Sequence, residues 1–476
     1  MAPVSSEASP LVKNQSSPPA TSTWNAVRVI GAAAAIIVGG GLIYYATRST
    51  TNTSTSSFCD PKVKHEFGYI QLPHKVNDHY FYSYFESRNN PATDPLVVWL
   101  EGGPGSSSTF TMFSMNGPCF VSDDFRTVLN PYSWTTNANM LWLDQPTGVG
   151  FSFGDAADDD SNEDDVGRNF YGFMQGFLRK HPELASTPFY IAGQSFGGHY
   201  VPAAANYIVR HQANQSTSAD ATHINLRGIW IGNGLTDTVM QFPKTVDMVD
   251  AVAQQYNITL ASPATVVQMR KDAAVVAHLI QECQSPNATQ VCLDAMSIWS
   301  EKLVGPMIEN PLRNPYDVRD ACSPACDDYG MAKLGTYLNL PHVQKALGVN
   351  QTYAWNNATV AAEFMVDAGK SVVHLVPEIL AAGVRVVLNV GDADLMCDWL
   401  GNDAWAKSLV WPGKASYNAA PVTPLVVDGA NAGQVRSAHG LSFVRIFNSG
   451  HCVPANQPVV SLELFNRFLQ NAALDK

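Results

Sequence analysis

The sequence predicts an α/β fold with a mostly parallel central sheet flanked by helices, and three features of the chain point to it. Short runs that are apolar throughout recur along the chain, as is typical of strands buried on both faces of a sheet. Amphipathic stretches with helical periodicity, such as 166–179 and 458–469, lie between several of these runs. The chain has 476 residues, of which 46% are hydrophobic and 15% charged, so it can bury a large core.

The globular pattern begins with two alternating segments, 67–72 and 79–86, which indicate a half-buried antiparallel pair. We expect the parallel part of the sheet to come from six short apolar runs: 96–100, 140–144, 189–193, 228–232, 384–390 and 443–447. Residues from about 236 to 335 interrupt this rhythm, because they hold helical pieces and four of the eight cysteines but no clear strand. We expect this segment to form an inserted helical cap.

Residues 1–57 differ in composition from the rest of the chain. Residues 1–28 are rich in Ser, Pro and Ala and predict a disordered tail, and the polar segment 47–57 predicts a flexible stem. Between them, 29–46 is apolar and uncharged, and a helix of this length is about 27 Å long, enough to cross the hydrocarbon core of a bilayer. We expect a transmembrane signal anchor there, with a cleaved signal peptide as the alternative, followed by one domain at 58–476.

The charge balance is acidic, with 29 Lys and Arg against 41 Asp and Glu. No basic stretch interleaved with aromatic residues is present in the sequence, so a nucleic-acid partner is not expected. Seven of the acids lie in the segment 155–165. We expect a solvated loop there, because the ligand spacing and the glycine of an EF-hand are absent.

Glycosylation sequons favour a lumenal protein of the secretory pathway. Six Asn-x-Ser/Thr sequons lie beyond residue 50, at Asn52, Asn214, Asn257, Asn287, Asn350 and Asn357. In an oxidising compartment the eight cysteines can form disulfides, although their spacing alone leaves many pairings open.

A nucleophile is predicted at Ser195, in the segment Gly193-Gln194-Ser195-Phe196-Gly197. This G-x-S-x-G pattern follows an apolar strand and precedes a helical stretch, which is the setting of a nucleophile elbow. The glycines are needed on both sides because the serine sits on a strained turn that leaves no room for side chains. A serine hydroxyl also needs a base to take its proton and a carboxylate to orient that base.

His451 is the predicted base. In this arrangement the chain order is Ser, acid, His, and only His439 and His451 follow the acidic segment 392–398. His451 comes directly after an apolar run, at a strand end where such sheets collect reactive groups, whereas His439 precedes its strand and is expected to be structural. The acid should also follow a strand end, and position alone leaves both Asp392 and Asp394 open.

An oxyanion hole is expected from the glycine-rich segment 102–105, which follows the predicted strand at 96–100. The backbone N–H of Gly103 would act together with that of Phe196 to hold the negative oxygen of a tetrahedral intermediate.

Seven motifs, which follow one another in the order of a known family, carry a resemblance to it. They are W-L-E-G-G-P-G-S-S at 99–107, N-P-Y-S-W at 130–134, D-Q-P-T-G-V-G-F-S at 144–152, G-Q-S-F-G-G-H-Y-V-P at 193–202, I-G-N-G-L-T-D at 231–237, G-D-A-D-L-M-C-D-W-L-G-N at 391–402 and N-S-G-H-C-V-P at 448–454. Over about 59–472 the chain resembles the serine carboxypeptidases, specifically the carboxypeptidase Y-like group.

The resemblance implies an α/β-hydrolase fold with an inserted cap. It also implies removal of C-terminal amino acids from peptides at acidic pH, through an acyl-enzyme on Ser195. The acid of the triad is then Asp394, which lies three residues before Cys397, and Asp392 becomes a structural neighbour.

The chain departs from the family pattern where the substrate carboxylate is bound. The family reads W-L-N-G-G and G-E-S, whereas the corresponding residues here are Glu101 and Gln194, so the acid and the amide have exchanged places. We expect Glu101, Gly102 and Gln194 to bind the carboxylate, because a buried carboxylate needs hydrogen-bond donors and a protonated acid supplies one at low pH. A further glutamate of the family corresponds to Met115.

The resemblance also implies two substrate pockets that are apolar or small, which indicates a preference for hydrophobic residues. The pocket residues are Phe196, Met396 and Cys397 for the penultimate side chain, and Phe110, Ser114, Met115 and Cys452 for the last one.

The cysteines are assigned with the same resemblance. Cys322–Cys326 matches a short loop disulfide of the family, Cys283–Cys292 is expected to close a cap loop, and Cys59–Cys119 is the remaining pair. Cys397 and Cys452 are expected to be free thiols, with a bond between them as the alternative. Ser106 stands where the family often has a cysteine bonded to a partner near 355–357.

Three functions are compatible with these features. The first is a serine carboxypeptidase that acts on peptide C-termini in a lysosome or vacuole or after secretion, either released or tethered as a type II membrane protein. An acyltransferase or esterase on the same scaffold is the alternative, because an alcohol can replace water as the acyl acceptor. The set of Ser195, Asp394 and His451 argues against the third, a non-catalytic membrane-tethered binding protein. We expect neither a metal ion nor an organic cofactor.

Overall fold

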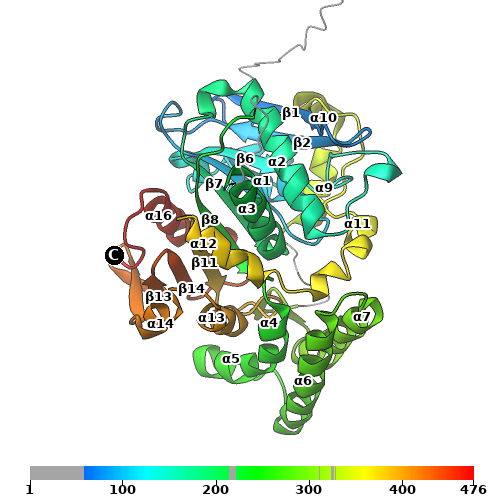
Figure 1. Ribbon diagram of the computed structural model, residues 1–476, viewed down its shortest axis with the longest axis vertical. Helices are drawn as coiled ribbons and strands as arrows, with labels where there is room; N and C mark the ends of the chain where they lie inside the picture. Colours follow the sequence, from blue (N-terminus) through cyan, green and yellow to red (C-terminus); the bar gives the residue numbers. More distant parts are fainter. Residues whose placement is uncertain (1–57, 214–220, 310, 323–325, 327–328) are drawn as a thin grey trace, which may run out of the picture. The chain divides into compact units, whose positions relative to one another are not determined.

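The computed structural model describes residues 58–213, 221–309, 311–322, 326 and 329–476 (Figure 1). The predicted tail at 1–28, anchor at 29–46 and stem at 47–57, and the sequons Asn52 and Asn214, lie outside the described residues. Within the described ranges, no helix has the length and apolar character that crossing a bilayer requires.

One mixed sheet forms the centre of the described domain. Its ten strands lie in the order β1-β2-β6-β3-β7-β8-β11-β14-β13-β12. The neighbours from β6 to β14 are parallel, and antiparallel pairs flank them on both sides. In chain order the strands are β1 (His65–Gln71), β2 (His79–Phe85), β3 (Leu96–Leu100), β6 (Asn139–Leu143), β7 (Phe189–Ser195), β8 (Leu226–Gly234), β11 (Arg385–Gly391), β12 (Thr423–Val427), β13 (Ala430–Ala438) and β14 (Leu441–Ile446).

The predicted fold class is confirmed, since all six apolar runs in the sequence are strands of the parallel region. The sequence did not indicate β12 and β13. At the edge of the sheet these strands carry several polar residues and expose much of their length, so the apolar signal is weak.

Helices cover both faces of the sheet, and each face has its own apolar core. Successive strand residues point to opposite faces: Val98 and Ile229 belong to one buried cluster, while Trp99 and Trp230 belong to the other. Helices α2 and α3 pack on the first face, as Figure 1 shows, and α1 and α16 contribute to the second cluster. The helices that precede α4 or follow α8 are α1 (Ser108–Ser114), α2 (Glu163–Lys180), α3 (Gly197–Ala213), α9 (Met331–Leu338), α10 (Pro341–Leu347), α11 (Ala358–Glu363), α12 (Val376–Ala381), α13 (Trp399–Ser408), α14 (Lys414–Ala419), α15 (Val453–Asn456) and α16 (Pro458–Leu469).

The segment 236–335 holds a group of helices with a third buried apolar cluster, which includes Val252, Val276 and Leu303 and also Ala393 and Leu395 from the loop after β11. These helices are α4 (Thr238–Lys244), α5 (Met248–Tyr256), α6 (Pro263–Cys283), α7 (Thr289–Ile298) and α8 (Gly305–Ile308). The same segment contains two short paired strands that the sequence did not predict, β9 (Arg313–Asn314) and β10 (Asp317–Ala321). A second small pair, β4 (Cys119–Val121) and β5 (Thr127–Leu129), lies outside the cap.

The three expected disulfides are present, at Cys59–Cys119, Cys283–Cys292 and Cys322–Cys326. Cys397 and Cys452 are buried free thiols, so the alternative of a bond between them is wrong.

The acidic segment 155–165 is only in part the solvated loop that its composition predicted, because Asp155, Asp159 and Asp164 are exposed whereas Asp158, Asp160 and Glu163 are buried. The Asp158 side chain accepts hydrogen bonds from the backbone N–H groups of Val76 and Asn77 at 2.7 and 2.8 Å. Asp160 is buried and pairs with Lys75 at 2.7 Å. These acids therefore hold the turn between β1 and β2, because buried carboxylates are stable only with donors or cations around them.

Candidate active site

Ser195 lies at the last position of β7, immediately before α3 begins at Gly197. Its φ of 59° is in the left-handed region, which a non-glycine residue occupies at a cost in backbone strain. A Cβ at Gly193 would come within 2.5 Å of the Leu100 carbonyl oxygen, and one at Gly197 within 2.9 Å of the same atom. The two flanking glycines are therefore required by close packing against β3, as the nucleophile-elbow pattern predicted.

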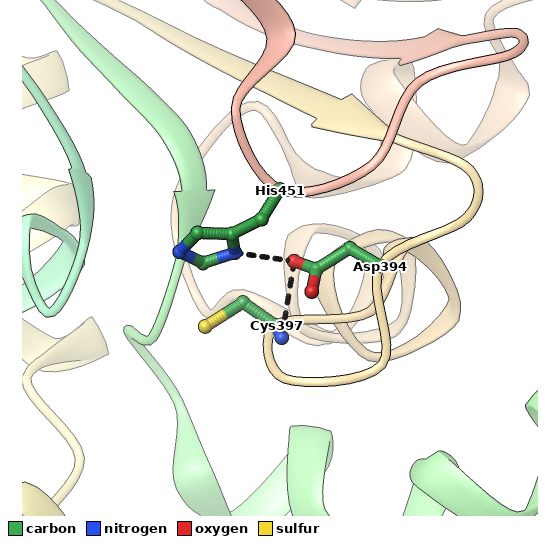
Figure 2. Close-up of side chains that lie close together, drawn as sticks. All are labelled: Asp394, Cys397 and His451. Atoms are coloured by element: carbon green, nitrogen blue, oxygen red, sulfur yellow. Dashed lines mark hydrogen bonds and ion pairs between the residues drawn. The ribbon is translucent and has the colours of Figure 1, made fainter. Parts of the chain in front are cut away.

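The imidazole of His451 and the carboxylate of Asp394 are hydrogen-bonded to each other, as Figure 2 shows. His451 Nδ1 lies 2.7 Å from Asp394 Oδ2. The carboxylate is fully buried and accepts further hydrogen bonds from Asn233 Nδ2 at 2.8 Å and from the backbone N–H groups of Met396 and Cys397 at 2.9 and 3.2 Å. Four donors thus fix the carboxylate, which in turn orients the imidazole and leaves Nε2 to take a proton.

The surroundings of His451 favour its protonated form. Burial alone would lower the pKa of this imidazole, but the charge and hydrogen bond of Asp394, with a smaller contribution from Glu101, raise it above its ordinary value. A raised pKa makes the imidazole a better proton acceptor, which suits a general base.

Ser195 and His451 line one cavity of about 260 Å³. The other residues around it are Glu101, Gly103, Ser106, Phe110, Met115, Gln194, Tyr316, Tyr329, Met331, Trp355 and Cys452. The nucleophile and the base thus face the same space, which reaches across the ends of β3, β7 and the loop after β14.

The glycine loop after β3 lies against the nucleophile turn. A Cβ on Gly102 would come within 2.4 Å of the Phe196 backbone nitrogen. Gly103, with φ +110°, lines the cavity. The backbone N–H groups expected to form an oxyanion hole, those of Gly103 and Phe196, therefore belong to two segments in tight contact.

Glu101 and Gln194 are buried side by side at the edge of this cavity. Gln194 Nε2 donates a hydrogen bond to Glu101 Oε1 at 3.2 Å. The other carboxyl oxygen accepts from Thr111 Oγ1 at 2.6 Å and from Trp99 Nε1 at 3.2 Å. Burial raises the pKa of Glu101 above its ordinary value, although these hydrogen bonds oppose the rise.

The structure brings some of the predicted pocket residues to the cavity and leaves others outside its wall. Phe110, Met115 and Cys452 line it, and the Cys452 and Met115 sulfurs lie 3.5 and 3.6 Å from Gln194 Nε2. Ser114 is not part of the lining, and its hydroxyl donates to the Phe110 carbonyl within α1. The remaining expected residues, Phe196, Met396 and Cys397, are also absent from that lining.

Residues that the sequence did not indicate also line the cavity: Tyr316, Tyr329, Met331 and Trp355. They come from the end of the cap and from the chain beyond it, and no motif or spacing in the sequence marks them. Ser106, which stands where the family often has a cysteine, contacts the residue next to Trp355. Asn356 Nδ2 donates to Ser106 Oγ at 3.0 Å, so a hydrogen bond joins the two segments.

Asp394, Cys397 and His451 place three metal-binding atoms within 4.8 Å of one another. The geometry fits a triad better than a metal centre. The imidazole Nδ1 is hydrogen-bonded to the carboxylate, which is the contact between the acid and the base of a triad.

Comparisons with known proteins agree with this geometry. The serine carboxypeptidase family model matches residues 56–471. Carboxypeptidase Y homolog A of Arthroderma otae is 37% identical over 422 residues, covering 86% of this chain and 75% of that protein. Its namesake in Trichophyton rubrum is 37% identical over 421 residues, covering 86% and 76%.

A solved structure shares the fold: KEX1(delta)p, a prohormone-processing carboxypeptidase from Saccharomyces cerevisiae. It has a TM-score of 0.74 and 23% identity, and the match covers 87% of this chain and 93% of that chain. With the family model matched over nearly all of the described domain, the chain belongs to the serine carboxypeptidase family of serine-type hydrolases.

Proposed function

We propose that the protein removes C-terminal amino acids from peptides through an acyl-enzyme on Ser195. His451 takes the hydroxyl proton as Ser195 attacks the last peptide carbonyl, and Asp394 holds the imidazole and stabilises its positive charge. The same imidazole then returns the proton to the leaving amine, and water resolves the ester. Support comes from the 2.7 Å contact between His451 and Asp394 and from the cavity that Ser195 and His451 share.

The observation that carries exopeptidase action is the buried pair of Glu101 and Gln194 beside Ser195. A free C-terminal carboxylate that enters this cavity loses its water and needs donors. A protonated Glu101 and the Gln194 amide supply them, and the raised pKa of Glu101 keeps its proton to a higher pH than an exposed glutamate would. Glu101 therefore sets the upper pH limit of the proposed activity at acidic pH, and protonation of His451 sets the lower limit.

The proposed substrates end in hydrophobic residues. Phe110, Met115 and Cys452 line the cavity and would contact the last side chain, and Ser114 in α1 is the remaining residue proposed for this pocket. Phe196, Met396 and Cys397 remain the residues proposed for the penultimate side chain on the family resemblance alone, because none of them lines this cavity.

We also propose that the enzyme works in the secretory pathway, in a lysosomal or vacuolar lumen or after secretion, with 29–46 as a signal anchor or a cleaved signal peptide. Three sequons have exposed asparagines, Asn257, Asn287 and Asn350, which favours glycosylation there. Asn357 is a poorer acceptor, because its amide donates to the Gly148 carbonyl at 2.9 Å and its oxygen caps α11.

Burst kinetics test the acyl-enzyme. With an activated ester such as a nitrophenyl ester, the proposal predicts a rapid release of one equivalent of alcohol, followed by slower turnover. A serine-directed fluorophosphonate should label the wild type and not the Ser195→Ala variant. Labelling that persists in this variant would place the nucleophile elsewhere.

A further inference from the structure

Tyr256 is the last residue of the cap helix α5, and its hydroxyl contacts two loops of the catalytic domain. It donates a hydrogen bond to Asp392 Oδ1 and accepts one from the backbone N–H of Asn448 at 3.2 Å. Asp392 lies two residues before Asp394, and Asn448 lies three residues before His451. One phenol therefore links the loop that carries the acid to the loop that carries the base.

The surroundings keep this phenol in place. Asp392 is buried, and its second oxygen lies 3.4 Å from Arg445 Nη2, while the Arg445 guanidinium lies 3.8 Å from the centre of the Trp399 ring. Arg319 lies over the Tyr256 ring at 5.9 Å and pairs with Asp317. Burial and the nearby Asp392 carboxylate raise the pKa of Tyr256, so the hydroxyl remains a donor across the working pH range.

The cap also holds the same two loops through its backbone. The His451 N–H donates to the Tyr316 carbonyl at 2.7 Å, and the Tyr316 ring lies 5.0 Å from the imidazole. The Leu395 N–H donates to the Pro315 carbonyl, and the Val318 N–H to the Ala393 carbonyl, both at 3.0 Å. The acid and the base are thus aligned by a part of the chain that belongs to neither loop.

We propose that Tyr256 is a positioning residue, which keeps Asp394 and His451 in register by bonding to both of their loops. This inference rests on the proposed function of the triad. It requires no contact between Tyr256 and the substrate, since its bonds go to Asp392 and Asn448.

The test compares Tyr256→Phe with Tyr190→Phe. Tyr190 is a matched control, because its hydroxyl also donates one hydrogen bond, to the Leu469 carbonyl, and accepts one, from Arg385. With a peptide substrate, we expect Tyr256→Phe to lower kcat by about 10- to 100-fold, as small misplacements of catalytic groups do, with KM within about two-fold. Tyr190→Phe should keep the wild-type kcat.

The pH profile separates positioning from a general loss of structure. Asp394 is the main group that raises the pKa of His451 against burial, and Glu101 adds to this only where its carboxyl is ionised. Loosening the contact with Asp394 should therefore move the acidic limb of kcat/KM to lower pH in Tyr256→Phe and not in Tyr190→Phe. A proton NMR signal from the His451 Nδ1–H, which a strong bond to Asp394 shifts downfield, should move upfield in the same variant and gives a readout without turnover.

The inference would be overturned if Tyr256→Phe had the same kcat, the same acidic limb of kcat/KM and the same His451 proton signal as the wild type. If Tyr256→Phe does not fold, the test uses Asp392→Ala, which removes the carboxylate that accepts the hydrogen bond of the phenol. This variant should show the same changes in kcat, in the acidic limb of the pH profile and in the His451 proton signal. The activity of Ser195→Ala distinguishes a failure of the proposed triad from a failure of the role proposed for Tyr256. Full activity in Ser195→Ala would refute the proposed triad, whereas an inactive Ser195→Ala with an unchanged Tyr256→Phe would refute only the role of Tyr256.

Discussion

Glu101 and Gln194 are buried and hydrogen-bonded to each other, with 3.2 Å between Gln194 Nε2 and Glu101 Oε1, where the glycine loop meets the nucleophile turn. Glu101 directly precedes the glycine-rich segment 102–105, and Gln194 directly precedes Ser195, so the pair lies beside the nucleophile, where the proposed function has it bind the substrate carboxylate. Their order is the reverse of the pattern that the family resemblance implies, yet one acid and one amide are still present. Under the proposed function, the proton on Glu101 decides whether this pair attracts or repels the substrate carboxylate.

Glu101→Gln should change the pH dependence of peptide cleavage. In the wild type, activity on a dipeptide with a blocked N-terminus and a free C-terminus should fall as the pH rises through the raised pKa of Glu101, because the ionised pair of carboxylates repels. Glutamine donates at every pH, so this decline should disappear. The measurement is kcat/KM from pH 4 to 8.

The matched substrate for this experiment has a C-terminal amide in place of the carboxylate. Its cleavage should lack the Glu101-dependent decline in both proteins. An alkaline limb that stays in place in Glu101→Gln with the free carboxylate would refute the role assigned to Glu101.

Asp394→Asn should abolish most of the activity while the protein stays folded. The amide cannot hold the imidazole in the tautomer that accepts the serine proton, and a loss in kcat of about 1,000-fold or more is expected. Asp392→Asn is the control on the same loop. Its amide oxygen can still accept from Tyr256, so its kcat should fall by no more than about ten-fold. Similar losses in both variants would leave the choice of the acid unsupported.

Stability should decline between acidic and neutral pH. Burial raises the pKa of Asp78 to about 7, of Asp398 to about 7 and of Asp367 to about 6. A carboxyl with a raised folded-state pKa contributes stability below its unfolded value, and the contribution is lost as the pH rises through the folded value. His199, whose pKa burial lowers to about 4, acts in the opposite direction between that value and its ordinary one. Three acids outweigh one histidine, so the unfolding temperature should fall from pH 5 to 7.5.

Asp78→Asn isolates one contribution to this decline. Asp78 is fully buried, one of its oxygens accepts from Thr147 Oγ1 at 2.5 Å, and the other has no partner among the described residues. The amide keeps the acceptor and cannot ionise, so the variant should lose less stability than the wild type over this range, by roughly 2 °C in Tm. Parallel Tm curves for the two proteins would contradict the assigned pKa.

Thiol chemistry offers a further check on the cavity. Peptide mapping without reduction should find Cys397 and Cys452 unpaired beside the three disulfides. Burial raises the pKa of both thiols well above the ordinary value, so alkylating reagents that need a thiolate should react slowly in the folded enzyme. Fast alkylation of Cys452 at pH 7 would show that the cavity wall opens more than the structure indicates.

The sequence predicted what depends on local chemistry. The strands of the parallel region are apolar on both faces, and the nucleophile turn demands glycines at 193 and 197, so both leave a clear pattern. The choice between Asp392 and Asp394 did not follow from position, because both residues lie in the loop after the same strand, β11. It needed the family resemblance, and the structure now shows only Asp394 bonded to His451.

The features that the sequence missed depend on long-range packing. Asp158 and Asp160 look like part of a solvated acidic run, yet they are buried because the turn between β1 and β2 brings backbone donors and Lys75 to them. Tyr316 and Trp355 are separated from Ser195 by more than a hundred residues and come from segments with no motif, so only the fold places them at the cavity. The hydrogen bonds from Tyr256 to the loops of Asp394 and His451 also depend on long-range packing and leave no pattern in the sequence.

The most direct test of the central claim is to identify the product that the purified protein releases from an N-blocked peptide at pH 5, with and without Ser195→Ala. The proposed function predicts free C-terminal amino acids, released one after another by the wild type and not by the variant. A wild type that releases no amino acid, or that forms product only when an alcohol acceptor is added, would contradict carboxypeptidase action and favour an acyltransferase.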